Sequence, residues 1–131
     1  MVGLLLITHN QIGAALFETA SSMIGMCPLT VDVLAVPGDC DPDAMVRRGL
    51  LLVDKLDSGQ GVLILTDIYG STPSNIAARL ADNRRVLVVS GVNLPMLVRV
   101  MNYPRLAVAE LAAKAESGGR DGIFFYVPDM E

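Results

Sequence analysis

Two side chains suited to chemistry follow apolar segments of this sequence. His9, the only histidine among 131 residues, follows the run VGLLLIT, and Asp67 follows the run GVLILT. A carboxylate beside an imidazole accepts the N–H of one ring nitrogen, so the other nitrogen presents its lone pair as a nucleophile. The carboxylate also stabilises the positive charge that the ring gains during attack. If the fold joins these two side chains, they form an oriented histidine nucleophile.

The segment GSTPSN, which begins three residues after Asp67, predicts an anion-binding turn. Gly70 permits tight backbone geometry, Ser71 and Thr72 provide hydroxyl and N–H groups, and Pro73 suits the first position of a helix. Helix N-termini bind phosphate through free N–H groups and the helix dipole. A nucleophilic nitrogen, an orienting carboxylate and an anion cradle together predict phosphoryl transfer onto the histidine. The absence of a Gly-x-x-x-x-Gly-Lys pattern argues against a nucleoside triphosphate as donor.

Each of these features also has a structural interpretation. A single histidine is commonly a packing or surface residue, and an aspartate after a strand commonly caps a turn or helix. The Ser/Thr segment is equally compatible with ordinary helix capping. Taken separately, the residues leave these alternatives open, and only their convergence at one place in the fold favours the functional interpretation.

Apolar runs alternate with helical patterns along the whole chain, in the order βαβαβαβααβ. Short runs of this apolarity are typical of strands that are covered on both faces. Strands separated by helices predict parallel pairing with right-handed crossovers. The predicted strands cover residues 2–8, 29–37, 61–66, 85–91 and 122–128, and the predicted helices cover residues 10–25, 42–56, 73–82, 94–102 and 104–119.

We therefore expect an α/β fold, a three-layer sandwich around a mainly parallel sheet of strand order 2-1-3-4. Sites in such sheets form at the carboxyl ends of the strands, where the strand order reverses. That point lies between the first and third strands, so His9 and Asp67 should meet there. The aromatic segment GIFFYVP is predicted to pair at a sheet edge or across a subunit boundary.

Composition excludes several other classes of protein. Hydrophobic residues make up 52% of the chain, but no run approaches the roughly 20 residues of a membrane span, and no basic leader precedes the first run. The net charge of −4 and the lack of basic clusters argue against nucleic acid binding. Cys27 and Cys40 with one histidine fit no zinc pattern, so we expect no metal. No linker divides residues 1–131, which predicts a single domain.

Three segments in order, LLLITHN, GVLILTDIYGSTPSNIAARLA and VVSGVNLPMLVRVM, resemble the signature segments of a known family. This family is the mannose-type IIA domain of the bacterial phosphoenolpyruvate–sugar phosphotransferase system. The resemblance implies that His9 accepts a phosphoryl group from the phosphocarrier protein HPr and passes it to a IIB partner. It also implies that Asp67 orients His9 and that the loop of Gly70, Ser71 and Thr72 lines the site, with no cofactor.

The same resemblance implies a cytoplasmic homodimer, in which a C-terminal antiparallel edge strand is exchanged between two subunits. Without a IIB segment, residues 1–131 would be a single IIA-type phosphocarrier domain. The chain departs from the family at Asn10, where glycine is usual, and at Ser71, where many members have a second glycine. Asparagine tolerates left-handed backbone geometry, so we keep Asn10 among the phosphate- or partner-binding residues. Thr66, before the aspartate, has no role assigned from the sequence.

Other functions remain open at this stage. The phosphorylation state of His9 could report carbon supply to a regulatory target, or the chain could pass phosphate toward a dihydroxyacetone kinase. A non-enzymatic regulatory binding module of the same fold is the main alternative. A flavodoxin-like cofactor binder is disfavoured, because Tyr69 is the sole aromatic residue in the predicted strand-end loops.

Overall fold

The computed structural model describes residues 1–82 and 84–129 of the chain. Strands and helices alternate as the sequence pattern predicts, with two helices after the fourth strand. The elements are β1 (Gly3–His9), α1 (Ile12–Ile24), β2 (Val31–Val36), α2 (Pro42–Leu56), β3 (Val62–Thr66), α3 (Thr72–Leu80), β4 (Val86–Ser90), α4 (Leu94–Met101) and α5 (Val108–Asp121).

The four strands form a parallel sheet in the order β2-β1-β3-β4, which confirms the predicted order 2-1-3-4. β1 and β3 are the central strands, and their continuous apolar sequences suit burial on both faces. In the register, Ile7 lies opposite Thr66, and Thr66 lies opposite Ser90. The residues that follow β1 and β3 therefore leave the sheet side by side at the same edge.

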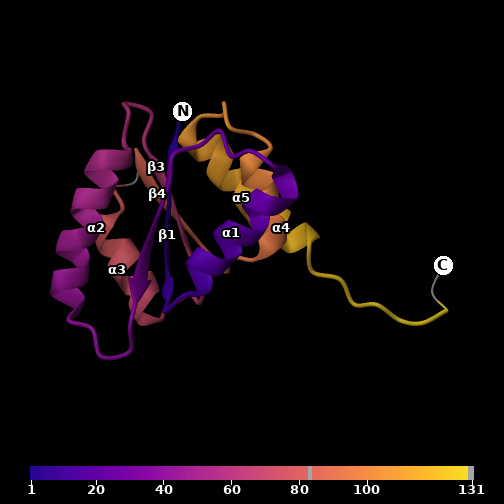
Figure 1. The fold of residues 1–131 in the computed structure, drawn as a ribbon, viewed down its shortest axis with the longest axis horizontal. Coiled ribbons are helices and arrows are strands. Elements are labelled where there is room, and N and C mark those ends of the chain that lie inside the picture. The colour runs from indigo at the N-terminus through magenta and orange to yellow at the C-terminus, as the bar shows by residue number, and fades with distance from the viewer. Residues whose placement is uncertain (83, 130–131) are drawn as a thin grey trace.

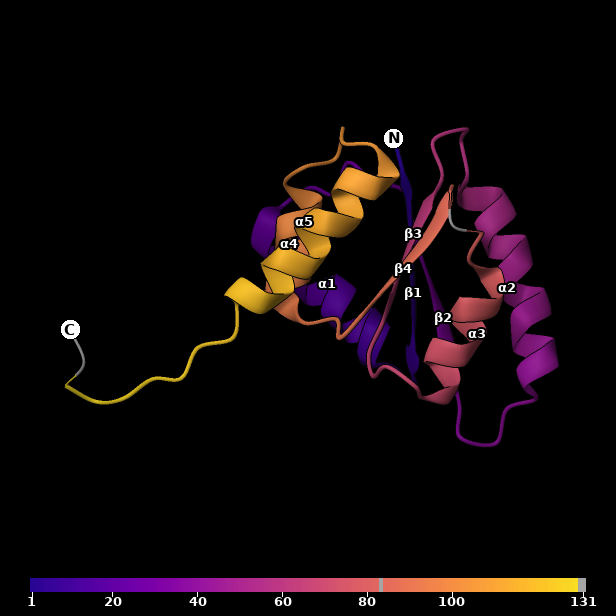
Figure 2. The same cartoon turned by 180° about the vertical axis from the view of Figure 1, so that it is seen from behind.

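Helices cover both faces of the sheet, as Figures 1 and 2 show from opposite sides. Alternate strand side chains point to opposite faces, so Leu63 belongs to one core and Ile64 to the other. α1, α4 and α5 pack over the first core, and α2 and α3 over the second. The predicted three-layer arrangement is thus confirmed.

The predicted C-terminal antiparallel strand does not form within this chain. Residues 123–127 leave the end of α5 without strand pairing and extend away from the body (Figure 1). We call residues 123–129 the C-terminal arm. Phe124 and Phe125 on the arm are 80% and 84% exposed. A strand needs a neighbour for its backbone hydrogen bonds, and no strand of the same chain lies beside the arm in the described part of the structure.

Two helix boundaries also differ from prediction. α1 begins at Ile12 rather than Asn10, because Asn10 adopts a left-handed φ of 47° that a helix cannot include. The pair Gly118–Gly119, predicted to end the last helix, lies inside α5. A Cβ on Gly118 would lie 2.5 Å from the Cβ of Arg99. These glycines therefore permit close packing of α5 on α4 instead of ending the helix.

Candidate active site

The structure brings His9 and Asp67 together at the carboxyl edge of the sheet. His9 is the last residue of β1, and Asp67 directly follows β3. The ring Nδ1 of His9 lies 2.8 Å from Oδ2 of Asp67, and the backbone N–H of His9 donates to the same oxygen at 2.9 Å. The strand order thus places the two side chains as the sequence predicts, 58 residues apart in the chain.

The Asp67 carboxylate is held in its charged form. Burial opposes its ionisation, but hydrogen bonds from the backbone and ring of His9 and from the Ile68 N–H outweigh burial and lower the pKa of Asp67. A charged carboxylate can only accept hydrogen bonds, so Nδ1 of His9 carries the proton. The lone pair then resides on Nε2, and the His9 side chain keeps 38% of its surface exposed, against 9% for Asp67. The geometry is that of an oriented nitrogen nucleophile.

Acid should weaken the fold through this carboxylate. Because the folded-state pKa of Asp67 is lowered, its stabilisation is complete above the unfolded value of about 3.9 and is lost as the pH falls through the lower folded value. We expect Asp67→Asn to unfold more easily than the wild type at pH 6, with a difference that shrinks below about pH 4. Urea unfolding of both proteins at several pH values measures this difference. A difference in unfolding free energy that stays constant down to pH 2.5 would show that the charge of Asp67 does not stabilise the fold.

The loop after Asp67 is ordered by its own hydrogen bonds. Gly70 has a φ of 85°, and its N–H donates to the Ser74 hydroxyl. The hydroxyl and N–H of Ser71 both donate to the Ile68 carbonyl. Both Ser71 donors are therefore engaged within the loop. Thr72 opens α3, so its N–H is one of the first-turn donors that a helix leaves without an internal partner.

Asn10 makes the turn that separates His9 from α1. Its φ of 47° is left-handed, as its tolerance of such geometry predicts, and its N–H donates to the Val36 carbonyl at 3.1 Å. Asn10 is exposed and directly follows His9 in the chain. Gln11, rather than Asn10, occupies the N-cap of α1, and Gln11 makes no side-chain capping bond. Asn10 therefore serves backbone geometry and leaves its amide free of a capping role.

The left-handed backbone at Asn10 predicts which substitutions at this position reduce the stability of the protein. Glycine adopts positive φ without steric cost, whereas alanine loses about 1 kcal/mol or more in left-handed geometry. We expect Asn10→Gly to retain wild-type stability within about 0.5 kcal/mol and Asn10→Ala to lose about 1 kcal/mol. Urea unfolding midpoints at pH 7 measure both. Equal stability of the alanine and glycine variants would show that this turn is not held in its left-handed form.

The structure adds residues at this edge to which the sequence alone gave no role in the site. Ile68 and Tyr69 follow Asp67 with 62% and 86% of their surfaces exposed, which places apolar surface next to Asp67 in the chain. Thr8 and Thr66, directly before His9 and Asp67, are fully buried. The sequence feature that could have identified Thr8 and Thr66 is a hydroxyl residue at the end of each central apolar run, directly before the candidate site residue.

Comparison with known proteins matches residues 3–116 to the model of the EIIA-man family, described as the PTS system fructose IIA component. The chain belongs to the mannose-type EIIA family of the phosphotransferase system. Members of this family are components of a sugar transport system and transfer phosphoryl groups through phosphohistidine. The matched range includes both His9 and Asp67.

Relatives agree with this assignment. The chain is 32% identical over 119 residues to the mannose-specific EIIAB component of Escherichia coli K12, covering 88% of this chain and 36% of that protein. It is 29% identical over 113 residues to the fructose-specific EIIA component of Bacillus subtilis, covering 85% and 77%. The chain thus spans about a third of the Escherichia coli relative and most of the Bacillus one.

Solved structures share the fold. The mannose/sorbose IIA subunit from Enterococcus faecalis superimposes with a TM-score of 0.85 over 99% of this chain and 98% of that chain, at 20% identity. The IIA protein of the fucose utilization operon from Streptococcus pneumoniae gives 0.74 over 89% and 93%, at 26% identity. Within the described residues, no helix has the length and apolar character needed to cross a bilayer. In that same part of the chain, no three metal-ligating side chains gather in one place.

Proposed function

We propose that this chain is a phosphocarrier in which Nε2 of His9 accepts a phosphoryl group from phospho-HPr and passes it to a IIB partner. The observation that carries the proposal is the 2.8 Å contact between Nδ1 of His9 and Asp67. That contact directs the free lone pair to Nε2 of a side chain that is 38% exposed. Membership of the EIIA family supports the choice of phosphoryl transfer over other uses of a histidine nucleophile.

The transfer balances without a further reactant. The Nε2 lone pair forms a bond to phosphorus while the bond between phosphorus and the donor histidine nitrogen breaks, and its electron pair returns to the donor ring. The proton on Nδ1 of His9 stays in place. Asp67 offsets the positive charge that develops on the ring. Because both bonds join phosphorus to an imidazole nitrogen, the reaction can run in either direction, as a carrier requires.

The turn and loop around the ring would receive the transferred group. Thr72 offers a first-turn N–H and a hydroxyl at the start of α3, where a helix attracts anions. Gly70 and Ser71 shape the loop, and Ser71 contributes after its hydroxyl turns from the Ile68 carbonyl. The exposed amide of Asn10 can donate to a phosphoryl oxygen or contact the donor protein. Preorganised donors of this kind stabilise charge in the transition state.

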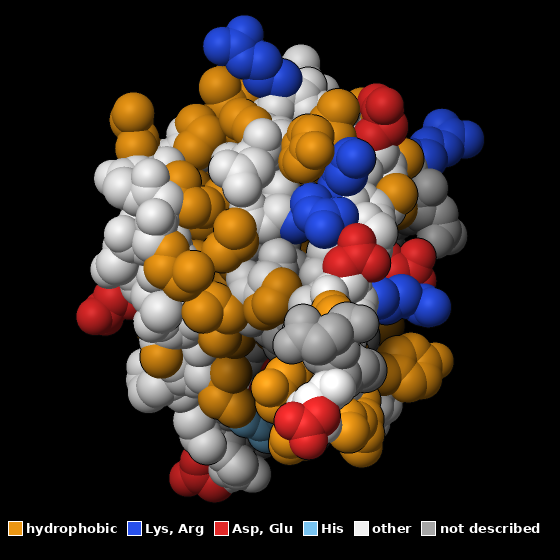
Figure 3. Space-filling model, turned by 90° about the vertical axis from the view of Figure 1, so that its right-hand side faces the viewer, with side chains coloured by type: hydrophobic (Ala, Val, Ile, Leu, Met, Phe, Trp, Pro, Cys, Tyr) orange, Lys and Arg blue, Asp and Glu red, His pale blue; other side chains and the backbone are white. Residues whose placement is uncertain are grey.

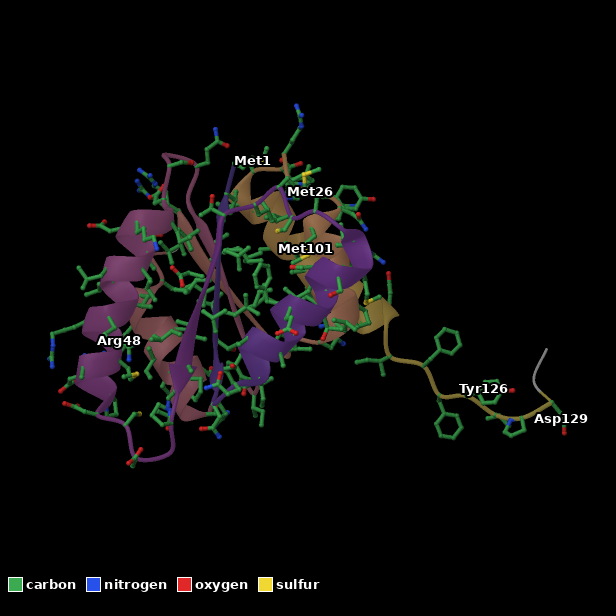
Figure 4. The ribbon with its side chains drawn as sticks, viewed as in Figure 1. Met1, Met26, Arg48, Met101, Tyr126 and Asp129 are labelled. Carbon is green, nitrogen blue, oxygen red and sulfur yellow. The ribbon has the colours of Figure 1, made fainter. Side chains whose placement is uncertain are left out.

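We also propose that two copies of the chain form a dimer by exchanging their C-terminal arms. Five arm residues, 123–127, are extended and largely exposed, and Figure 4 shows aromatic side chains projecting to alternate sides near Tyr126. Figure 3 views the molecule from the side toward which the arm extends, and hydrophobic side chains form much of that surface. An exposed apolar segment of this length is typical of an interface.

The acceptor for the arm is the outer edge of β4. β4 pairs only with β3 in the described sheet. Its five residues match the extended arm residues 123–127 in length. Beside β4 lies a groove of about 880 Å³. Its lining includes apolar side chains of α3, β4 and α5, among them Ala78, Val88, Val89, Ala112 and Ala113, together with the polar residues Ser90, Asn93, Glu116 and Arg120. An antiparallel strand laid there would cover the edge and end at Pro128, which cannot donate to a ladder.

Incubation with phosphoenolpyruvate, enzyme I and HPr tests the phosphocarrier proposal directly. We expect the intact mass of the chain to rise by one phosphoryl group, and the modification to be labile in acid and stable in base. Omission of HPr should prevent the gain. Binding of HPr without any mass gain would instead support a regulatory binding module, for which the Asn10 departure from the family glycine is the favouring observation.

The protein that receives the phosphoryl group from His9 determines whether the chain serves transport, signalling or a kinase. We propose a cytoplasmic IIA domain that serves a separate IIB partner, with signalling through the phosphorylated form or donation to a dihydroxyacetone kinase as the other acceptors to be tried. Mixing the phosphorylated chain with purified IIB proteins and with the kinase, and following loss of the phosphoryl group, distinguishes these acceptors.

A further inference from the structure

Buried polar side chains concentrate directly behind the candidate site. In the described part of the chain, the polar residues classed as buried are Thr8 and Thr66, with no exposed surface, and Ser74, with 7%. Thr8 precedes His9, Thr66 precedes Asp67, and Ser74 follows the Gly70 loop in α3. A buried hydroxyl is unfavourable unless it is hydrogen-bonded, so each of the three calls for a specific partner.

Thr8 joins β1 to the first turn of α1. Its Oγ1 accepts the Gly13 N–H at 2.7 Å in a buried contact. Because the N-cap residue Gln11 makes no side-chain bond, Thr8 satisfies a first-turn donor from the preceding strand. A Cβ on Gly13 would lie only 2.9 Å from this oxygen, so glycine permits the close approach. The bond spans the turn that follows His9.

Thr66 anchors the residue before Asp67 to the end of β4. Its hydroxyl donates to the Ser90 hydroxyl oxygen at 2.9 Å. Its carbonyl accepts the N–H groups of Gly91 at 3.0 Å and Val92 at 2.9 Å. Three hydrogen bonds therefore fix the position from which the Asp67 side chain reaches toward His9.

Ser74 supports the loop on the same side of the sheet as Thr66. Its Oγ accepts the Gly70 N–H at 3.2 Å, which ties the left-handed Gly70 to the first turns of α3. Thr66 lies two residues after Ile64, so it points to the face that α2 and α3 cover. Thr8 contacts α1 on the opposite face. The site is thus supported from both faces of the sheet.

We propose that Thr8, Thr66 and Ser74 are positioning residues that hold His9, Asp67 and the Gly70 loop in the geometry for phosphoryl transfer. Valine has the shape of threonine and would suit the surrounding apolar layers, so packing alone does not explain these hydroxyls. A nucleophile must be held closely to its productive position, and small displacements reduce rates greatly. The effect on the transfer rate rests on the proposed function, whereas the effect on the His9 ring does not.

Isosteric removal of each threonine hydroxyl tests the proposal. The variants are Thr8→Val and Thr66→Val, with Thr8→Ser and Thr66→Ser as hydroxyl-retaining partners. We expect each valine variant to lower the maximal rate of phosphoryl acceptance from phospho-HPr by about 10- to 100-fold, with little change in the half-saturating donor concentration. ¹⁵N NMR of the His9 ring should show loss of the single Nδ1–H tautomer. The serine variants should recover most of the rate and the wild-type ring spectrum.

Val2→Ala is the matched control for lost stability. Val2 is buried just before β1, at the edge of the sheet opposite to His9. We expect the Val2→Ala protein to show the wild-type His9 ring spectrum and the wild-type rate of phosphoryl acceptance. Folded valine variants with a wild-type ring spectrum and rate would overturn the proposal, as would an equal loss of rate in Val2→Ala. If one valine variant does not fold, the other supplies the ring spectrum, and Ser74→Ala tests the Gly70 loop through the rate of phosphoryl acceptance. If the wild type accepts no phosphoryl group, the proposed phosphocarrier function is wrong. The His9 ring spectra still show whether the hydroxyls position the imidazole.

Discussion

His9→Ala should gain no phosphoryl group from phospho-HPr, because no other histidine is present to take its place. Nε2 of His9 is the nitrogen that the Asp67 contact leaves with its lone pair free. Intact mass spectrometry after incubation with phosphoenolpyruvate, enzyme I and HPr measures the result, with the wild type gaining one group. Circular dichroism should show an unchanged fold, since the half-exposed His9 side chain contributes little to either core.

Asp67→Asn keeps a hydrogen-bond acceptor for the His9 ring but removes the negative charge beside it. The amide oxygen can still accept a hydrogen bond, but it carries no charge to offset the positive ring. We therefore expect phosphorylation that is slower by about 10²- to 10⁴-fold yet not abolished, by analogy with charge removal beside other catalytic histidines. Single-turnover transfer from phospho-HPr gives the rate. Full phosphorylation of His9→Ala, or a wild-type rate for Asp67→Asn, would exclude this pair as the reactive centre.

Phe125→Asp should convert the proposed dimer into monomers. Burial of one phenylalanine side chain contributes about 1.5 to 3 kcal/mol. Because the dimer buries one Phe125 from each chain, the variant loses about twice this amount, which is roughly 10²- to 10⁴-fold in the dissociation constant. A buried aspartate adds a desolvation cost, so we expect dissociation to increase at least 100-fold at neutral pH. Sedimentation equilibrium over a concentration series measures the dissociation constant. The fold of each protomer should persist, because Phe125 is 84% exposed within one chain.

Leu51→Asp is the matched control for the arm variant. Leu51 lies on α2 and is 72% exposed, so it receives the same change at a comparably open position outside the arm and the β4 groove. Dimerisation of Leu51→Asp should match the wild type. A wild-type chain that stays monomeric at all concentrations, or a Phe125→Asp protein that still dimerises, would show that the arm has another role.

Most of the fold follows from local patterns that need no tertiary information. Continuous apolar runs such as 61–66 predict central strands, and the predicted helix over residues 42–56 coincides with α2, whose N-cap residue Asp41 accepts the Asp43 N–H. With right-handed crossovers, 2-1-3-4 is the simplest strand order for such an alternation, and the structure confirms it. The meeting of His9 with Asp67 could be predicted for this reason, since both residues end neighbouring central strands.

Apolar periodicity is a local property, so the amino-acid sequence predicts the alternation of strands and helices and the positions of His9 and Asp67 at strand ends. The partner of each backbone donor depends on the folded structure. The tertiary structure paired Thr8 with Gly13 and Thr66 with Ser90, and it placed Gly118 inside a helix contact. It also left residues 123–127 without a partner. Such choices depend on which groups from distant segments come into contact, and a hydroxyl or a strand has no preferred partner until the chain has folded around it.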